Sequence, residues 1–403
     1  MTYTDETEAE QISSSRRLRI AIILGALSAL APLSIDMYLP SLPALTTALQ
    51  TNTSLAQLSL TCCLLGLALG QLFAGPLSDR FGRRSPLIVG LGIYAISSVL
   101  CAFVPSIWWL IVLRLIQGTA GAAGIVISRA VVRDMYSGTE MTRFFSLLML
   151  INGVAPILAP VFGGQLLRVT SWRGVFIVLG ILGVAMLIGV LFGLPESLPE
   201  ERRATGGVKG TLFTFGGLLA DRTFMGYALS QGLVMAAMFG YISGSPFVLQ
   251  NIFGVSPQMF SVCFAINGLG IIIASQISGR LAARVGETKL LIIGLTLAAL
   301  GGLALLLMIL LGEGLFAILP PLFVLVSSVG VVATTSSSLA MQNQGKAAGS
   351  AAALLGVPQL ILGAVAAPLV GLGGSHAATP MGVVIAIADV GAGVCYMALA
   401  RRR

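Results

Sequence analysis

Long apolar runs recur along the whole chain, each followed by a short segment with charged, Gly or Pro residues. At 1.5 Å per residue, a helix needs about 20 residues to cross the roughly 30 Å of hydrocarbon in a bilayer. Twelve runs reach that length: 20–42, 55–77, 86–104, 107–130, 144–167, 173–194, 223–248, 257–281, 288–311, 315–336, 347–371 and 379–399. They are continuously apolar, whereas membrane barrel strands alternate. The pattern predicts an all-α polytopic membrane protein with twelve transmembrane helices.

The longest polar connection, 195–222, divides these runs into two groups of six. We therefore expect a tail at 1–19, a six-helix bundle at 20–194, a linker at 195–222, a second bundle at 223–399 and a basic tail at 400–403. The halves also repeat a short pattern: Gly75, Leu77, Arg80 and Gly82 align with Gly279, Leu281, Arg284 and Gly286. Internal repeats of this kind are typical of duplicated transporters.

Composition agrees with the membrane assignment, since 56% of residues are hydrophobic and 9% are charged, against about 25% in soluble domains. Charge also predicts the orientation. If both termini are cytoplasmic, every Lys and Arg except Arg114, Arg168 and Arg173 lies inside, as the positive-inside rule requires. The net charge of +8 is then explained by the membrane topology and by attraction to anionic lipid, and a nucleic-acid partner is not needed to explain it. We expect a monomer spanning the bacterial inner membrane.

Little in the chain points to an enzyme or a metalloprotein. The single histidine, His376, falls in a predicted outer loop without Asp, Glu or Cys at metal-ligand spacing. The five cysteines lie within apolar runs, where they read as small core residues. A phosphate-binding G-x-x-x-x-G-K loop is absent, which excludes ATP hydrolysis by that motif. We expect no metal, no cofactor and no catalysis, with a proton gradient as the energy source.

Three charged residues lie well inside the predicted spans: Asp36, Arg114 and Asp389. Inserting each of these side chains into the membrane costs at least about 2.5 kcal/mol, so each is expected to have a structural or functional role. Counted along their helices, Asp36 is roughly 24 Å from the inner end and Arg114 roughly 10 Å from the outer end, which predicts that both face one cavity. Asp36 is then a candidate proton carrier for which proton and substrate compete, with Arg114 beside it. A structural ion pair is the alternative, and the role of Asp389 stays open.

Adaptable apolar side chains with a few hydrogen-bonding groups suit a site for unrelated small molecules. Residues of these types occur beside Asp36, on the fifth span and on the seventh, where they either line a cavity or face lipid and other helices. The candidates for the substrate wall are Met37, Tyr38, Asn152, Met235, Met238, Phe239 and Tyr241.

Three motifs carry a family resemblance. The segment G-P-L-S-D-R-F-G-R-R at 75–84 resembles the signature loop of the major facilitator superfamily, G-x-L-a-D-r-x-G-r-[RK]. The run 110–123 around Arg114 resembles the fourth-helix motif of proton-coupled members. Residues 152–164 are similar to the fifth-helix antiporter motif, with Ala155 in place of its central glycine. The matching residues of that motif are Gly153, Pro156, Pro160, Gly163 and Gly164, which suit either a hinge or close helix packing.

Within the superfamily, L-S-I-D-M-Y-L-P-S-L-P at 33–43 and A-V-V-R-D-M-Y at 130–136 resemble the Bcr/CflA drug-resistance family. This likeness implies proton-coupled export of small drug-like molecules by alternating access. The runner-up is a transporter of a metabolite such as a sugar, a nucleoside or an organic anion on the same fold. Importers of polar solutes usually need more buried polar side chains than the second half offers.

The signature loop also predicts a charge-assisted latch on the cytoplasmic side, near the ends of the second, fourth and eleventh spans. We expect Arg133 to be the partner of Asp79, and breaking the latch to favour the inward-open state. The simpler alternative is that the basic residues only orient the protein in the membrane through their positive charge. The residues of this gate are Gly75, Asp79, Arg80, Gly82, Arg83, Arg84 and Arg133.

Overall fold

The computed structural model describes residues 14–136, 138–203, 219–342, 348–374 and 376–400. All regular elements within these ranges are helical, and twelve of the helices are long and apolar enough to cross a membrane. The predicted all-α fold with twelve transmembrane helices is confirmed. The boundaries predicted at 1–19 and 195–222 fall partly on residues outside the described ranges, and the division into domains stays a prediction.

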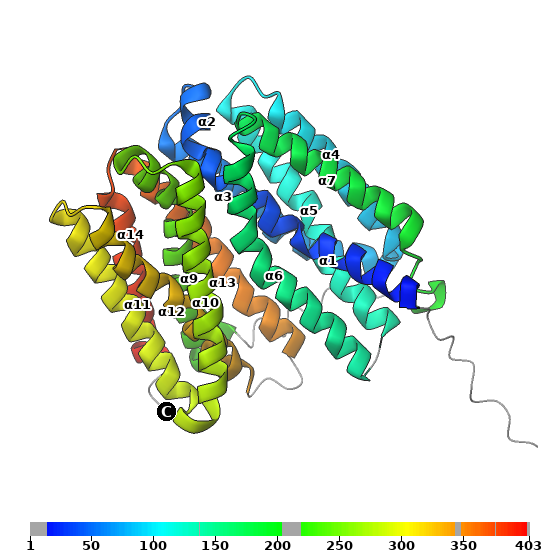
Figure 1. Ribbon diagram of the computed structural model, residues 1–403. Helices are drawn as coiled ribbons and strands as arrows, with labels where there is room; N and C mark the ends of the chain where they lie inside the picture. The colour runs from blue at the N-terminus through cyan, green and yellow to red at the C-terminus, as the bar shows by residue number, and fades with distance from the viewer. Residues whose placement is uncertain (1–13, 137, 204–218, 343–347, 375, 401–403) are drawn as a thin grey trace, which may run out of the picture.

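The first six membrane-spanning helices form one group and the last six form another, side by side in Figure 1. The first group and its short helices are α1 (Ser14–Asp36), η1 (Leu39–Ser41), α2 (Leu42–Ala48), α3 (Thr53–Phe81), α4 (Arg84–Ala102), α5 (Ile107–Met135), α6 (Gly138–Leu166), α7 (Trp172–Gly193) and η2 (Glu200–Arg202). The second is α9 (Arg222–Phe247), η3 (Val248–Ile252), α10 (Pro257–Val285), α11 (Glu287–Leu310), α12 (Leu315–Met341), α13 (Ala348–Val370), η4 (Gly371–Gly373), α14 (Thr379–Cys395) and η5 (Tyr396–Ala400).

The first span is interrupted, whereas the sequence predicted an unbroken run from 20 to 42. Helix α1 ends at Asp36, and the chain continues through a turn, the short helix η1 and then α2. Pro40 and Pro43 cause the break, because proline has no N–H to give to the preceding helical turn. Asp36 is therefore the last residue of α1, directly before a two-residue turn.

Small residues allow the helices to approach closely. Helices α3 and α5 pack along much of their length, and a Cβ at Gly66 or Gly118 would collide with backbone atoms of the facing helix. The two halves meet mainly where α6 packs on α10 and where α3 packs on α13. We call the end of the molecule at which α1 begins the terminal side, and the end at which α1 stops and α10 begins the far side.

The repeat between the halves is visible in the backbone. Gly82 follows α3 with φ of 86°, and Gly286 follows α10 with φ of 88°. Side chains with a Cβ rarely adopt positive φ, so the same position of both halves needs glycine for the same turn. The sequence alignment of the halves thus corresponds to a shared local structure.

Candidate functional site

A cavity of about 600 Å³ lies between the two halves. Helices α1, α3, α5 and α6 of the first half and α9, α10, α12 and α13 of the second contribute to its wall. Most of the lining is hydrocarbon. Its polar side chains are Asp36, Gln71, Asn152, Tyr241, Ser275 and Thr334.

Asp36, the last residue of α1, is the charged member of this lining, and it shares a helix face with Pro32 and Ile35 of the same wall. The residue is 6% exposed, and its carboxylate has no hydrogen-bond or ion-pair partner within the described part of the chain. Tyr241 of the opposite half is close enough to interact with it electrostatically. A carboxylate at such depth without a protein cation is costly when ionised, so it is suited to holding a proton or a positively charged ligand.

Arg114 does not face this cavity, and the prediction that it shares one with Asp36 is wrong. Its guanidinium is 0% exposed, donates to Gln117 Oε1 at 2.6 Å and to the Ser34 carbonyl at 2.9 Å, and stacks on the ring of Tyr38 at 4.9 Å. Counting residues along a helix gives its depth but not its rotation, which here turns Arg114 into the first half.

Arg114 belongs to a hydrogen-bonded cluster that holds the end of α1. Besides the bond from Arg114 to the Ser34 carbonyl, the Ser34 hydroxyl shares a hydrogen bond of 2.7 Å with the Tyr94 hydroxyl. Gln117, which accepts from Arg114, donates to Ser98 Oγ at 2.7 Å. Because Ser34 precedes Asp36 by two residues, this cluster fixes the backbone that presents the carboxylate to the cavity.

Five of the seven residues predicted for the substrate wall line the cavity. The residues of that set that line the cavity are Asn152, Met235, Met238, Phe239 and Tyr241. Met37 and Tyr38 lie outside it, which corrects the prediction for these two. Both are buried in the apolar core behind the end of α1, where the Tyr38 hydroxyl shares a hydrogen bond of 2.9 Å with Ser59. Because a helical backbone turns by about 100° per residue, the side chains of the two residues after Asp36 point to other faces than Asp36 does.

Sequence reasoning missed two features of the wall. Gln71 of α3 lines the cavity with an exposed side chain that has no hydrogen-bond partner within the described residues. Phe264 of α10 also lines it and stacks on Tyr241, with ring centroids 5.5 Å apart. Gln71 was detectable as a polar residue within an apolar run, whereas Phe264 resembles many other apolar residues.

The residues of the antiporter motif lie on α6, along the cavity and the contact between the halves. Gly153 and Pro156 line the cavity. Farther along, the Pro160 carbonyl accepts from Ser261 Oγ at 2.7 Å, and the Gly164 carbonyl accepts from Gln258 Nε2 at 2.8 Å. Together with bonds from Gln57 to the Ser243 carbonyl and from Gln250 to the Pro40 carbonyl, these are the inter-half hydrogen bonds of the described residues. All four lie on the far side.

Replacing Gly163 by alanine is expected to destabilise the protein by about 3 kcal/mol and to impair transport. A Cβ at Gly163 would collide with the Met37 carbonyl, a backbone atom that cannot turn away. Gly153→Ala is the matched control, since its Cβ would meet only the Ile272 Cδ1 atom at 3.9 Å. Thermal unfolding of the purified variants gives the comparison. Equal unfolding temperatures for the two would refute the close approach of α6 to the end of α1.

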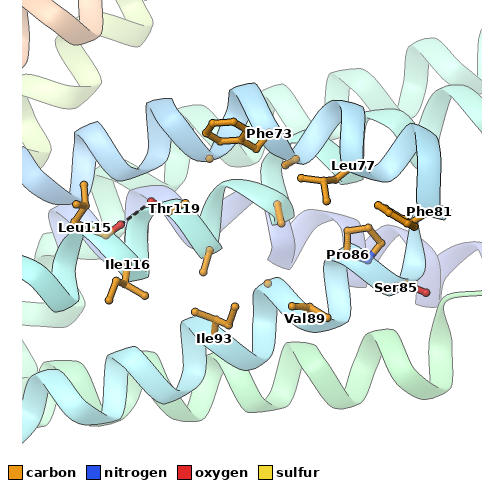
Figure 2. Close-up of a pocket in the computed structure, with 15 residues that line it drawn as sticks. Phe73, Leu77, Phe81, Ser85, Pro86, Val89, Ile93, Leu115, Ile116 and Thr119 are labelled. Atoms are coloured by element: carbon orange, nitrogen blue, oxygen red, sulfur yellow. Dashed lines mark hydrogen bonds between the residues drawn. The ribbon is translucent and has the colours of Figure 1, made fainter. Parts of the chain in front are cut away.

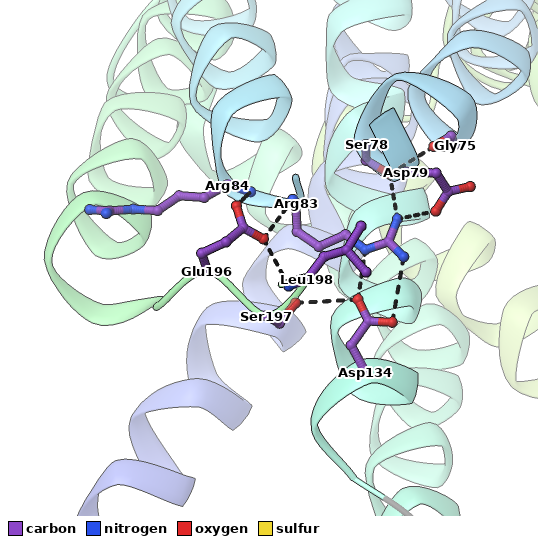
Figure 3. A network of polar contacts seen from close by, with 9 residues as sticks. All are labelled: Gly75, Ser78, Asp79, Arg83, Arg84, Asp134, Glu196, Ser197 and Leu198. Carbon is purple, nitrogen blue, oxygen red and sulfur yellow. Dashed lines mark hydrogen bonds and ion pairs between the residues drawn. The ribbon is translucent and has the colours of Figure 1, made fainter. Parts of the chain in front are cut away.

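A network of charges occupies the terminal side of the first half (Figure 3). Arg83 donates to Asp134 Oδ2 at 2.7 Å, to Asp79 Oδ1 at 2.5 Å and to Ser78 Oγ at 2.8 Å. Its side chain is 4% exposed, against 13% for Asp134 and 43% for Asp79. Burial alone would lower the pKa of Arg83, but the hydrogen bonds to both carboxylates outweigh it and raise that pKa.

This network corrects the prediction that Arg133 pairs with Asp79. Arg133 is exposed and has no hydrogen bond or ion pair within the described residues. Its neighbour in sequence, Asp134, points to Arg83 instead. The eleventh span, α13, supplies no partner among the side chains that the structure describes, so the network lies within the first half.

The remaining predicted gate residues shape the same loop. The Gly75 carbonyl accepts from Ser78 Oγ at 2.8 Å, and Gly82 provides the left-handed turn. The Arg80 guanidinium lies 5.3 Å from the centre of the Phe81 ring. Glu196, which the sequence did not single out, accepts from the backbone N–H groups of Arg83 and Arg84 at 2.8 and 3.1 Å. Although partial burial opposes it, hydrogen bonds from the backbone N–H groups of Leu198, Arg83 and Arg84 lower the pKa of Glu196.

A second cavity, of about 700 Å³, lies among α3, α4 and α5 and is lined almost wholly by apolar side chains (Figure 2). Its polar lining residues are Ser85 and Thr119, and Thr119 donates to the Leu115 carbonyl. Phe73 and Val89 in its wall are largely exposed. It contains no ionisable group, and we assign no transport step to it.

Asp389, whose role the sequence left open, is buried in α14 against Gly302 of α11. Its Oδ2 atom has no hydrogen-bond partner within the described part of the chain, and the residue does not line the central cavity. It is therefore separated from the site around Asp36.

The fold agrees with comparisons against known proteins. The family model described as Major Facilitator Superfamily matches residues 24–368. The chain belongs to the major facilitator superfamily. Members of this superfamily are transporters and not enzymes, so the predicted class of protein is confirmed.

Relatives within the superfamily are named for drug resistance or are uncharacterised. An uncharacterised MFS-type transporter of Bacillus subtilis is 43% identical, over 97% of this chain and 98% of its own. The bicyclomycin resistance protein homolog of Haemophilus influenzae is 29% identical, over 89% and 90%. The resemblance to the bicyclomycin-resistance branch is thus confirmed.

The fold also matches solved structures of the superfamily. The xylose transporter XylE from E. coli, in a partially occluded inward open conformation, superposes with a TM-score of 0.71 at 17% identity. The match covers 96% of this chain and 98% of that one. At this identity the likeness concerns the fold alone.

Proposed function

We propose that this member of the major facilitator superfamily exports small, lipophilic, drug-like molecules in exchange for protons. The observation that carries the proposal is the central cavity, in which one unpaired carboxylate, Asp36, lies in a wall of methionine, aromatic and aliphatic side chains from both halves.

The lining indicates the class of substrate. Methionines and aromatic rings such as Met235, Met238 and Phe239 form an adaptable apolar surface that accepts differently shaped ligands. Gln71 and Asn152 offer hydrogen bonds, and the described lining includes a carboxylate but no cation. Lipophilic cations and neutral lipophilic molecules fit this chemistry better than anions do.

Coupling follows from competition for Asp36. A protonated Asp36 is neutral and holds no cation, whereas an ionised Asp36 attracts one. If proton and substrate exclude each other at one carboxylate that alternately meets the two sides of the membrane, exchange results without a second ionisable site. The cluster around Arg114 acts in this scheme by holding the end of α1, and Arg114 itself is a positioning residue.

The orientation and access of the cavity are part of the proposal. The positive-inside rule places the terminal side in the cytoplasm of a bacterial inner membrane, since Arg168 and Arg173 are the basic residues of the opposite loops. The four inter-half hydrogen bonds lie on the far side, which corresponds to a transporter closed toward the outside. Alternating access then requires those bonds to break while contacts form on the terminal side. We expect the monomer to carry out the whole cycle, with no cofactor.

The second candidate is a transporter of a metabolite, and the likeness to the xylose transporter is the observation in its favour. A sugar needs many hydrogen-bond partners, however, because each of its hydroxyls loses water on binding. The cavity offers few polar side chains, and two of them, Ser275 and Thr334, bond to each other at 2.9 Å.

Transport by inside-out membrane vesicles distinguishes the two candidates. With the interior acidified, vesicles that contain the protein are expected to accumulate a fluorescent lipophilic cation, and a protonophore should release it. Xylose and a nucleoside serve as competing polar solutes. Accumulation of either polar solute in place of the cation, or cation accumulation that the protonophore leaves unchanged, would contradict proton-driven drug export.

A further inference from the structure

A basic pocket lies at the terminal side of the first half, away from the central cavity. Its volume is about 480 Å³, and it is bounded by Arg19 of α1, Arg84 of α4 and residues 191–195 at the end of α7. Helix α7 packs against both α1 and α4, which brings Arg19 and Arg84 into the lining of one pocket at its last turn. Both charged residues of this lining are positive.

These two guanidinium groups have donors to spare. Arg84 extends away from the Arg83 network in Figure 3 and donates to the Leu191 carbonyl, while its Nε is buried without a hydrogen-bond partner. Arg19 has no hydrogen bond or ion pair within the described residues. Glu196, the acid that directly follows the pocket residue Pro195, accepts from the backbone N–H groups of Arg83, Arg84 and Leu198. An anion entering the pocket would therefore meet the Arg19 guanidinium and the terminal N–H groups of Arg84, whose described partner is a single carbonyl.

An apolar groove of about 470 Å³ continues from this pocket into the membrane-spanning part. Arg19, Phe192 and Gly193 belong to both, and the rest of the groove consists of Leu18, Ile22, Ile23, Ile188 and Gly189. The aliphatic part of the Arg19 side chain packs over Gly193, since a Cβ added to Gly193 would lie 3.4 Å from Arg19 Cδ. The Arg19 guanidinium thus stands at the junction of pocket and groove, as expected for an arginine at the edge of the hydrocarbon.

We propose that this combined site binds an anionic phospholipid, with the phosphate between Arg19 and Arg84 and one acyl chain along the groove of α1 and α7. Arginine forms paired, charge-assisted hydrogen bonds with phosphate oxygens. A free phosphate would leave the groove empty, and a zwitterionic lipid carries a cation that the two arginines repel. The inference concerns the membrane-embedded fold and does not depend on the proposed transport activity.

Native mass spectrometry of the purified full-length chain tests the proposal. Titration with phosphatidylglycerol is expected to give one lipid adduct at lower concentration than titration with phosphatidylcholine of the same chains. At about 1 kcal/mol per arginine near a membrane surface, Arg19→Gln or Arg84→Gln should weaken this adduct roughly fivefold, and the double variant about thirty-fold. Arg19→Lys keeps the charge and should retain most of the binding.

Matched variants separate this site from general charge attraction. Arg280→Gln with Arg284→Gln removes the same charge from the terminal side of the second half and should leave the adduct unchanged. Gly189→Leu fills the groove and should weaken binding, while Gly189→Ala should not, since its Cβ meets Ile23 at an ordinary 3.6 Å. Equal losses in both double-arginine variants would overturn the proposal. Displacement of the lipid by glycerol phosphate at similar concentration would also overturn it, because the groove would then contribute nothing.

Discussion

Replacing Asp36 by asparagine is expected to abolish uphill transport driven by a pH gradient, with a loss of at least about tenfold. Asparagine has the same shape and stays neutral, so the cavity keeps its lining but no longer exchanges a proton for a cation. Accumulation of a fluorescent lipophilic cation in inside-out vesicles, normalised to the amount of protein, measures the effect. Downhill movement of a neutral substrate should persist, since it needs no carboxylate.

Asp389→Asn is the matched control for this experiment. Asp389 is also a buried carboxylate in a membrane-spanning helix, but it lies against Gly302 and away from the cavity. Its asparagine variant should therefore retain proton-driven accumulation. Retained uphill accumulation by Asp36→Asn, together with its loss in Asp389→Asn, would move the proton site from the first half to the second.

Replacing Arg83 by glutamine is expected to destabilise the protein by about 3 kcal/mol, the lower end of the range for breaking a buried ion pair. The change leaves the Asp134 carboxylate, which is 13% exposed, without its cation. Asp79 is 43% exposed and contributes less, because water screens that pair. Thermal unfolding of the purified variant measures the loss. We expect the loss of stability in the first half to be detectable before any shift in the equilibrium between the inward-open and outward-open states is detected.

The neighbouring substitution Arg133→Gln provides the contrast. The Arg133 side chain is exposed, and a change at such a position usually alters the free energy of unfolding by no more than about 0.5 kcal/mol. If Arg133→Gln proved as damaging as Arg83→Gln, the latch would have the partner that the sequence predicted and not the one in the structure.

The sequence alone predicted the features that depend on composition along the chain. Twelve runs of sufficient length predicted twelve helices, because the thickness of the bilayer sets a length that each must meet. Asp36, which lines the cavity, was recognisable as a candidate because a charge within an apolar run is costly. Met235, Met238 and Phe239 of α9 line the cavity together, because their spacing of three and four residues puts them on one face of the helix.

Features that depend on the rotation of a helix about its axis, or on contacts between residues far apart in the sequence, could not be predicted. Arg114 contacts Ser34 and Gln117 and not the cavity, because the rotation of α5 is set by its packing on α3, α4 and α1. Arg83 and Arg133 are equally basic in sequence, and only the approach of α5 to the loop after α3 decides between them. Glu196 reaches the same loop from 113 positions farther along the chain.

The competition of proton and substrate for Asp36 is tested most directly by proton release on binding. A lipophilic cation added to the purified protein in weakly buffered detergent solution, at a pH where the carboxyl is protonated, should release about one proton per bound molecule. Asp36→Asn should bind more weakly and release none. Binding without proton release by the unaltered protein, or equal release by Asp36→Asn, would contradict the exchange of proton for substrate at this residue.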